Sequence, residues 1–135
     1  MFKMNFKKII PDTLIVLTIF LMDRIFKIYI LKIAELEEKV DIYINSFLNF
    51  YLIWNKGIAF GLLSFDKIII YQLISLIIFT ISVVLIFMII KSEGLKKYSL
   101  ISILGGALGN LFDRIYYSAV PDFIDLHFNG FHWFI

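Results

Sequence analysis

An uncharged apolar run of 23 residues, Ile68–Ile90, constrains this chain more than any other feature. A helix rises about 1.5 Å per residue, so about 20 apolar residues cross a hydrocarbon core of about 30 Å. Hydrophobic residues make up 61% of the 135 positions and charged residues 18%, against about 45–50% and about 25% in soluble domains. The run is therefore predicted to be a membrane-spanning helix.

Two further segments are candidate spans. Residues 13–31 are apolar except for three charged residues near the far end, and residues 97–114 are shorter and richer in small residues. The predicted fold class is an all-α polytopic membrane protein, a helix bundle with three transmembrane helices in one domain, residues 1–135. A cleaved signal peptide is a weaker alternative for the first span, because no small-x-small cleavage site follows it.

The distribution of lysine predicts the sidedness, because basic residues are retained on the cytoplasmic side. The N-terminal segment carries three lysines, and residues 91–97 carry three lysines against one acid. Residues 32–67 carry four lysines but five acids. We therefore expect the N-terminus and residues 91–97 inside, and the 32–67 loop and the 115–135 segment outside.

Part of the outer loop has the composition of a small sheet. Residues 41–61 are rich in Tyr, Phe, Ile and Trp, partly in alternation, and include two glycines. This pattern favours short strands with a tight turn, lying at the membrane surface where Tyr51 and Trp54 can anchor. A small β-rich surface loop is the expected result.

The composition also excludes several classes of site. The chain has no cysteine, which rules out disulfides and cysteine-ligated metals. Its 13 basic and 11 acidic residues are too balanced to suggest a nucleic-acid partner. His127 and His132 have no third ligand nearby in sequence, so they are interpreted as interface residues, and neither a metal nor a cofactor is expected.

Charged residues in or beside a span are costly and are functional candidates by default. Asp23 and Lys27 are spaced i,i+4 on one helical face, with Arg24 beside them. They could form an ordinary ion pair with the basic side chains reaching toward the interface. They could equally form a clamp that orients a site at the outer surface. The sequence leaves both interpretations open.

The segment Asn55–Gly61 contains Asn and Gly in a turn-like arrangement. A hairpin turn is the commoner explanation, although glycine also lets backbone approach a ligand closely.

The third candidate lies at the end of the last span. Gly105 and Gly109 form a small-xxx-small pair that lets another helix approach closely. A helix that only packs needs the glycines but has no use for the polar residues that follow, which favours a functional role. Those residues are Asn110, Asp113 and Arg114.

Asp122 lies between Pro121 and Phe123. A carboxyl in apolar surroundings has a raised pKa, which suits acid–base chemistry near neutral pH. A solvated loop aspartate is the plain alternative.

In this order and at these separations, the four motifs resemble those of the lipoprotein signal peptidase (signal peptidase II) family, over essentially the whole chain. The resemblance implies a four-helix, multi-pass enzyme of the bacterial cytoplasmic (inner) membrane, with its active site on the extracytoplasmic face. It implies an aspartic endopeptidase that removes signal peptides from diacylglyceryl-modified prolipoproteins without a cofactor or metal. Prolipoproteins and membrane lipid are the implied partners, and a monomer is expected.

The resemblance also implies roles for individual residues. Asp122 would be one of two catalytic aspartates. The supporting residues would be Asn110, Asp113, Arg114, Asp23 and Lys27, and the substrate-binding residues Asn55, Gly57 and Phe60. The second aspartate belongs to a Phe-Asn-x-Ala-Asp motif that would lie beyond Ile135 and open the fourth helix, so residues 1–135 are expected to be truncated and inactive or impaired. Arg24 departs from the family pattern, which usually has Gln there.

The main alternative is a non-enzymatic membrane protein that packs helices as a small subunit or accessory factor. It explains the spans and the glycines, but not the polar residues at the outer ends of the first and third spans. A transporter fragment is less consistent, because relay acids should lie near the bilayer midplane.

Overall fold

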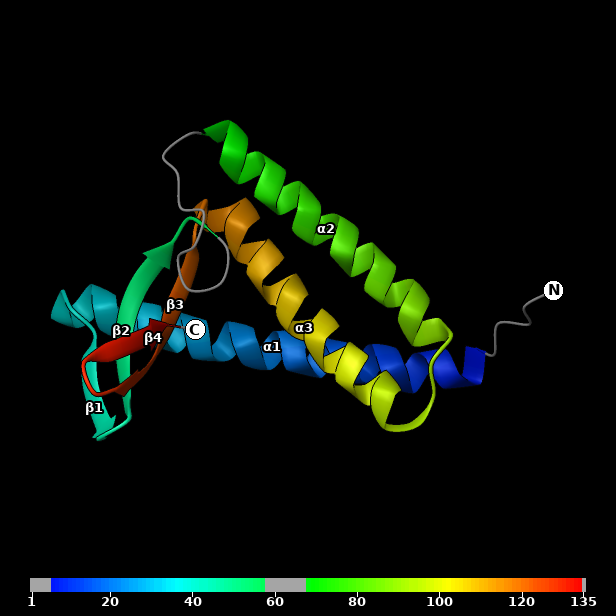
Figure 1. The fold of residues 1–135 in the computed structure, drawn as a ribbon, viewed down its shortest axis with the longest axis horizontal. Helices are drawn as coiled ribbons and strands as arrows, with labels where there is room; N and C mark the ends of the chain where they lie inside the picture. The colour runs from blue at the N-terminus through cyan, green and yellow to red at the C-terminus, as the bar shows by residue number, and fades with distance from the viewer. Residues whose placement is uncertain (1–5, 58–67, 135) are drawn as a thin grey trace.

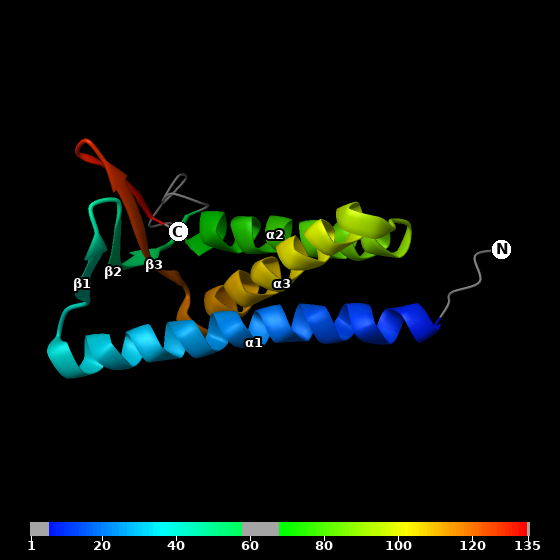
Figure 2. The ribbon, with the colours of Figure 1, turned by 90° about the horizontal axis from the view of Figure 1, so that it is seen from below.

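The computed structural model describes residues 6–57 and 68–134. The elements follow in the order α1 (Phe6–Glu37), β1 (Asp41–Asn45), β2 (Leu48–Asn55), α2 (Ile68–Ile90), α3 (Gly94–Tyr117), β3 (Val120–Phe128) and β4 (Phe131–Phe134). The three helices lie together, and the sheet lies beside the C-terminal end of α1, which ends at Glu37 (Figures 1 and 2). The molecule therefore has a helical part and a sheet at one end of it.

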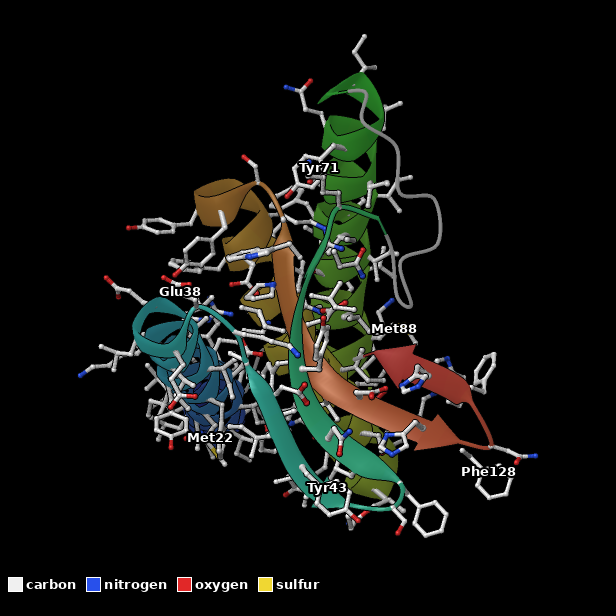
Figure 3. All side chains as sticks on the ribbon, turned by 90° about the vertical axis from the view of Figure 1, so that its left-hand side faces the viewer. Met22, Glu38, Tyr43, Tyr71, Met88 and Phe128 are labelled. Carbon is white, nitrogen blue, oxygen red and sulfur yellow. The ribbon has the colours of Figure 1, made fainter. Side chains whose placement is uncertain are left out.

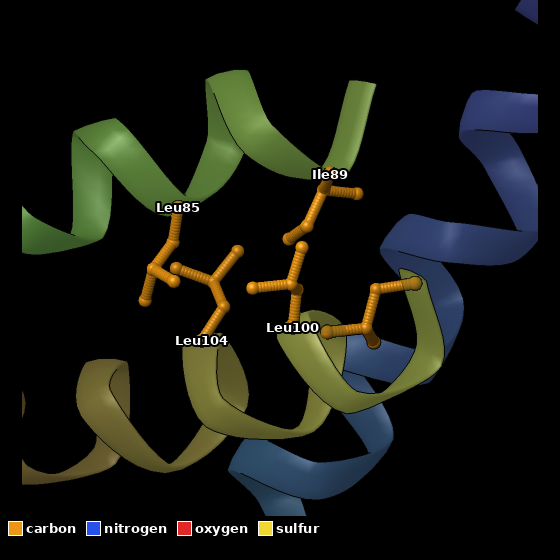
Figure 4. Packing of buried hydrophobic residues seen from close by; sticks show 5 residues of the cluster. Leu85, Ile89, Leu100 and Leu104 are labelled. Atoms are coloured by element: carbon orange, nitrogen blue, oxygen red, sulfur yellow. The ribbon is translucent and has the colours of Figure 1, made fainter. Parts of the chain in front are cut away.

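Helix α3 is the centre of the helical part, because it packs against both α1 and α2 (Figure 2). Leu85 and Ile89 of α2 meet Leu100 and Leu104 of α3 in a buried apolar cluster (Figure 4). Ile101, also in this cluster, is fully buried. Much of the remaining α2 surface consists of exposed large apolar side chains. Such a surface suits lipid better than water.

The glycines of α3 let α1 approach closely. A Cβ atom at Gly105 would come within 2.7 Å of Ile19 Cγ2. Real Cβ atoms do not approach a neighbour so closely, so a side chain here would force the helices apart. One turn later, Gly109 faces Asp23 in the same way. The small-xxx-small pair is therefore the contact surface between α3 and α1.

The four strands form one antiparallel sheet in the order β1-β2-β3-β4. Its central pair joins segments far apart in the chain, with Asn49 opposite Asp125 and Asn55 opposite Val120. The chain passes from α3 to β3 through Ser118, whose φ of 57° is left-handed. This pairing brings Asp122 beside the end of β2.

The predicted helices and the short strands of the 41–61 segment are present, but the all-α description is incomplete. No strand was assigned to the outer segment 115–135 from the sequence, yet this segment supplies β3 and β4. The predicted loop 32–67 also begins as helix, because α1 continues to Glu37. Residues that favour helices, such as Ala, Leu and Glu, fill that last turn and a half.

Among the residues that the structure describes, the stretch Tyr71–Ile90 is the one helix segment long and apolar enough to cross a membrane by length and composition. The candidate spans 13–31 and 97–114 correspond to parts of α1 and α3. Their charged and small polar residues lower their hydropathy below that of α2.

Candidate active site

A buried ionic cluster joins α1 to α3. Asp113 of α3 has no solvent-exposed surface, and each of its carboxylate oxygens meets a cation of α1. Lys27 Nζ lies 2.6 Å from Asp113 Oδ2, and Arg24 Nη1 donates to Asp113 Oδ1. Arg24 and Lys27 are themselves buried. Charges at this depth are stable only when they are paired, and here they are.

Asp23 completes the charge balance of the cluster. Its carboxylate lies 3.0 Å from Lys27 Nζ and 2.5 Å from Arg24 Nη2. The i,i+4 spacing of Asp23 and Lys27 places both on one face of α1. A Cβ atom at Gly109 would overlap the Asp23 carboxylate. The carboxylates of Asp23 and Asp113 thus neutralise Arg24 and Lys27. Because Gly109 has no side chain, the Asp23 carboxylate fits between the two helices.

Asn55 holds the Asp122 carboxyl at the end of the sheet. Its Nδ2 donates to Asp122 Oδ2 at 2.7 Å, and its own Oδ1 accepts from the Gly57 amide at 2.7 Å. The second bond fixes the orientation of the Asn55 amide, so that its NH2 group faces the carboxyl. Asn55 is buried, whereas Asp122 is half-buried and remains accessible to a reactant.

The surroundings of Asp122 favour its protonated form. Burial raises the pKa of the Asp122 carboxyl above its ordinary value, and the negative charge of Asp113 adds to the rise. The hydrogen bond from Asn55 and the charges of Lys27 and Arg114 oppose it without cancelling it. Asp122 therefore takes up a proton more readily than a solvated aspartate, as a general acid or base near neutral pH requires.

Arg114 connects the helices to the turn after β2. Its Nη2 donates to the Gly57 carbonyl oxygen at 2.8 Å, and its Nη1 donates to the Asn110 carbonyl oxygen at 3.2 Å. Its own carbonyl oxygen accepts from the Tyr71 hydroxyl at 2.9 Å, at the start of α2 (Figure 3). The Arg114 side chain thus ties α3 to the segment that carries Asn55.

The structure places most of the sequence-predicted site residues in two adjoining networks. Asp23, Lys27, Asn110 and Asp113 belong to the ionic cluster, where Lys27 also donates to Asn110 Oδ1 at 2.8 Å. The second network holds the residues around the carboxyl of Asp122, which are Asn55, Gly57 and Arg114. Phe60 lies outside the described residues. The functional roles of all these residues stay predictions.

Two residues in these networks were not assigned to the site from the sequence. Arg24 pairs with both Asp23 and Asp113, and its guanidinium lies 4.9 Å from the centre of the Phe112 ring. A basic residue directly after Asp23 inside an apolar segment was a signal for this role. Tyr71 is the other, and nothing in the apolar run around it indicated a partner at the end of α3.

The expectation that His127 and His132 have no third ligand nearby in sequence is wrong, because Asp125 stands two residues before His127. Asp125 lies within reach of both rings, and the three side chains can place their ligand atoms within 4.8 Å of one another. Strand alternation and cross-strand pairing, rather than sequence distance alone, create this group.

Comparison with known proteins identifies the family. The family model described as signal peptidase (SPase) II matches residues 15–135. A lipoprotein signal peptidase of Pelagibacter ubique is 54% identical over 133 residues, which cover 98% of this chain and 80% of that protein. One from Francisella tularensis subsp. novicida is 44% identical over 105 residues, covering 73% of this chain and 63% of that protein.

Solved structures agree with this assignment. A bacterial membrane enzyme determined by the in meso method at 2.3 Å superposes with a TM-score of 0.71 and 28% identity, covering 98% of this chain and 79% of that one. A second, at 1.9 Å, has the same TM-score at 24% identity and supports the fold alone. On the family model, the relatives and the shared fold, the chain belongs to the lipoprotein signal peptidase (signal peptidase II) family of aspartic peptidases.

Proposed function

We propose that this protein is an endopeptidase that removes signal peptides from diacylglyceryl-modified prolipoproteins, with Asp122 as one of two catalytic aspartates. One observation carries the assignment of Asp122. Its carboxyl is half-buried with a raised pKa, oriented by Asn55, and close enough to Lys27, Arg114 and Asp113 for their charges to act on it.

An aspartic dyad needs one ionised carboxylate to activate water and one protonated carboxyl to assist the carbonyl oxygen. Asp113 is unsuited to be the partner, since both its oxygens are held by cations. Asp125 is held by two histidines. We infer from the family resemblance that the partner is the aspartate of a Phe-Asn-x-Ala-Asp motif.

The ionic cluster has the properties of a support for this chemistry. The cluster fixes α1 against α3 through the ion pairs of Asp23, Arg24, Lys27 and Asp113. Arg114 then links α3 to Gly57, just after β2, by a hydrogen bond. Catalytic groups must be held within about 0.5 Å of the productive geometry, which needs such surrounding contacts. In this proposal the cluster positions Asp122 and Asn55 without contacting the scissile bond.

The proposed membrane arrangement has three spans, in α1, α2 and α3. The charges of α1 and α3 lie in a neutral cluster toward one end, which lowers the cost of placing them near lipid. At the other end, Lys97 pairs with Asp12 across the two helices. The lysine bias puts Lys97 inside, so the site and the sheet lie on the extracytoplasmic face of the inner membrane.

The sheet is the proposed surface for substrate. Asn55 and Gly57 lie at the end of β2, beside Asp122, and the exposed rings of Tyr51 and Trp54 come from the same strand. An extended peptide laid along this end of the sheet would bring its backbone to the Asp122 carboxyl. Trp and Tyr suit the level of the lipid headgroups, where a lipid-modified cysteine would lie.

The test uses the protein as its gene encodes it, with a lipid-modified prolipoprotein as substrate and cleavage followed by gel shift. Asp122→Asn should abolish cleavage, because the amide can neither accept nor return the proton. The matched control is Asp41→Asn, the same change at an exposed carboxylate of β1 that pairs with Lys39; it should leave cleavage unchanged. Cleavage by the Asp122→Asn protein at the control rate would refute the assignment.

A further inference from the structure

A group of polar side chains on β2, β3 and β4 is unused by the proposed mechanism. Asp125 and His127 are two residues apart on β3, and alternate residues of a strand point to the same face. His132 of β4 is the direct cross-strand partner of His127, and Asn49 of β2 is the partner of Asp125. Directly paired residues share a face. The sheet topology therefore collects these four residues on one side of the sheet.

Three of them converge on a common point. His132 Nδ1 lies 3.0 Å and 2.8 Å from the two carboxylate oxygens of Asp125, and His127 Nδ1 lies 3.4 Å from Asp125 Oδ2. The two imidazole rings are stacked, with centroids 5.3 Å apart. Asp125 is almost completely buried, while half of the His132 side chain is exposed. The group is thus anchored at its base and open to solvent at one side.

Two buried polar atoms at this group lack a hydrogen-bond partner in the described structure. They are His127 Nδ1 and Asn49 Oδ1. Buried polar atoms are nearly always hydrogen-bonded, so each exception needs an explanation. His127 Nδ1 is directed at a carboxylate that His132 already engages. A cation between these atoms would satisfy the nitrogen, and water bound to the cation could donate to Asn49 Oδ1.

We propose that Asp125, His127 and His132 form a divalent metal site for Zn²⁺. Two imidazole nitrogens and one carboxylate oxygen are a donor set that Zn²⁺ commonly takes, with water in the fourth position. Zinc–ligand distances of about 2.0–2.1 Å put tetrahedral ligand atoms about 3.3 Å apart. The separations of 2.8 Å and 3.4 Å from Asp125 Oδ2 bracket that value. All three ligand atoms lie within 4.8 Å of one another, so rotation of the side chains would bring them to the ion.

The site is separate from the proposed catalytic carboxyl, because Asp122 has Asn55 as its partner and not the histidines. Its effect would be structural. Asp125 and His127 lie on β3 and His132 on β4, so the ion would cross-link the hairpin near its tip, where β3 ends at Phe128 (Figure 3). Because β3 also carries Asp122, a fixed hairpin would hold the catalytic strand more firmly. This inference does not depend on the proposed peptidase activity.

The test measures binding of Zn²⁺ alone to the metal-free purified protein in detergent, by titration calorimetry. The unmodified protein should bind one ion per chain. His127→Gln, His132→Gln and Asp125→Asn should each weaken binding by at least about 10- to 100-fold, the loss that even outer partners of a metal ligand cause. The control Asp41→Asn, a carboxylate on β1 of the same sheet, should bind as the unmodified protein does.

A second readout separates binding from folding. Zn²⁺ should raise the thermal midpoint of the unmodified protein, because a ligand that binds only the folded state stabilises it. His132→Gln alters a half-exposed side chain and should keep its metal-free midpoint while losing the rise. Equal affinity in the unmodified protein and all three ligand variants would overturn the proposal, as would the absence of binding. In the latter case Asp125 and the two histidines interact with one another without a bound metal.

Discussion

Asp113→Asn tests whether the ionic cluster holds α1 against α3. Asp113 is the fully buried partner of both Arg24 and Lys27, and Asn keeps its shape but replaces one acceptor oxygen with an NH2 donor. Either Arg24 or Lys27 would then face the NH2 group of the asparagine instead of an acceptor. Both cations would depend on the single carboxylate of Asp23 for charge balance. Removing one partner of a buried ion pair costs about 3–5 kcal/mol. The folding equilibrium should therefore fall by a factor of more than about a hundred.

The assay is reversible unfolding in mixed micelles, with a double-mutant cycle as its internal control. Lys27→Met should be strongly destabilising alone, yet much less so in the Asp113→Asn background, because it restores the charge balance there. The coupling energy should be about 0.5–3 kcal/mol. Asp41→Asn, at an exposed pair, should not change stability measurably. Equal costs of Lys27→Met in both backgrounds would refute the interpretation that Asp113 and Lys27 stabilise each other.

Three further predictions follow from single features. Gly109→Ala should lower the free energy of unfolding by about 1–3 kcal/mol, because the helices must repack around the added methyl group. Gly106→Ala is the control and should be neutral, since nothing lies near its Cβ position. Equal unfolding midpoints of the two variants would contradict the close approach of α1 at Gly109. Folding raises the pKa of Asp122, so ionisation of this carboxyl destabilises the native state above that pKa. At high pH, Asp122→Asn should therefore be more stable than the unmodified protein. This difference in the free energy of unfolding should shrink as the pH falls through the raised pKa. A difference in stability that grows toward low pH would refute the prediction. The chain has no native cysteine; an impermeant thiol reagent on whole cells should label Lys56→Cys but not Lys96→Cys, and the opposite pattern would overturn the orientation.

Local sequence was enough to predict α2 and the existence of α1 and α3, because an uncharged run and a small-xxx-small pair constrain a helix through its immediate neighbours. Asn110, Asp113 and Arg114 were also identifiable from the sequence, because charge in an apolar segment is costly wherever the chain folds. Asn55 and Asp122 were assigned to a site only through the family resemblance. The composition of residues 41–61 indicated short strands for the same local reason, a preference of aromatic and β-branched residues for the pleated backbone.

The tertiary structure alone decided which of these residues meet. Asp113 contacts Arg24 and Lys27 only because α1 and α3 cross where Gly109 has no side chain. The strands of the 115–135 segment depend on pairing with β2, some 70 positions earlier, and the grouping of Asp125 with two histidines depends on that register. A one-residue slip would turn every side chain of a strand to the other face. Periodicity records which face of an element is apolar, whereas the partner across a sheet or helix contact is set by packing between distant segments.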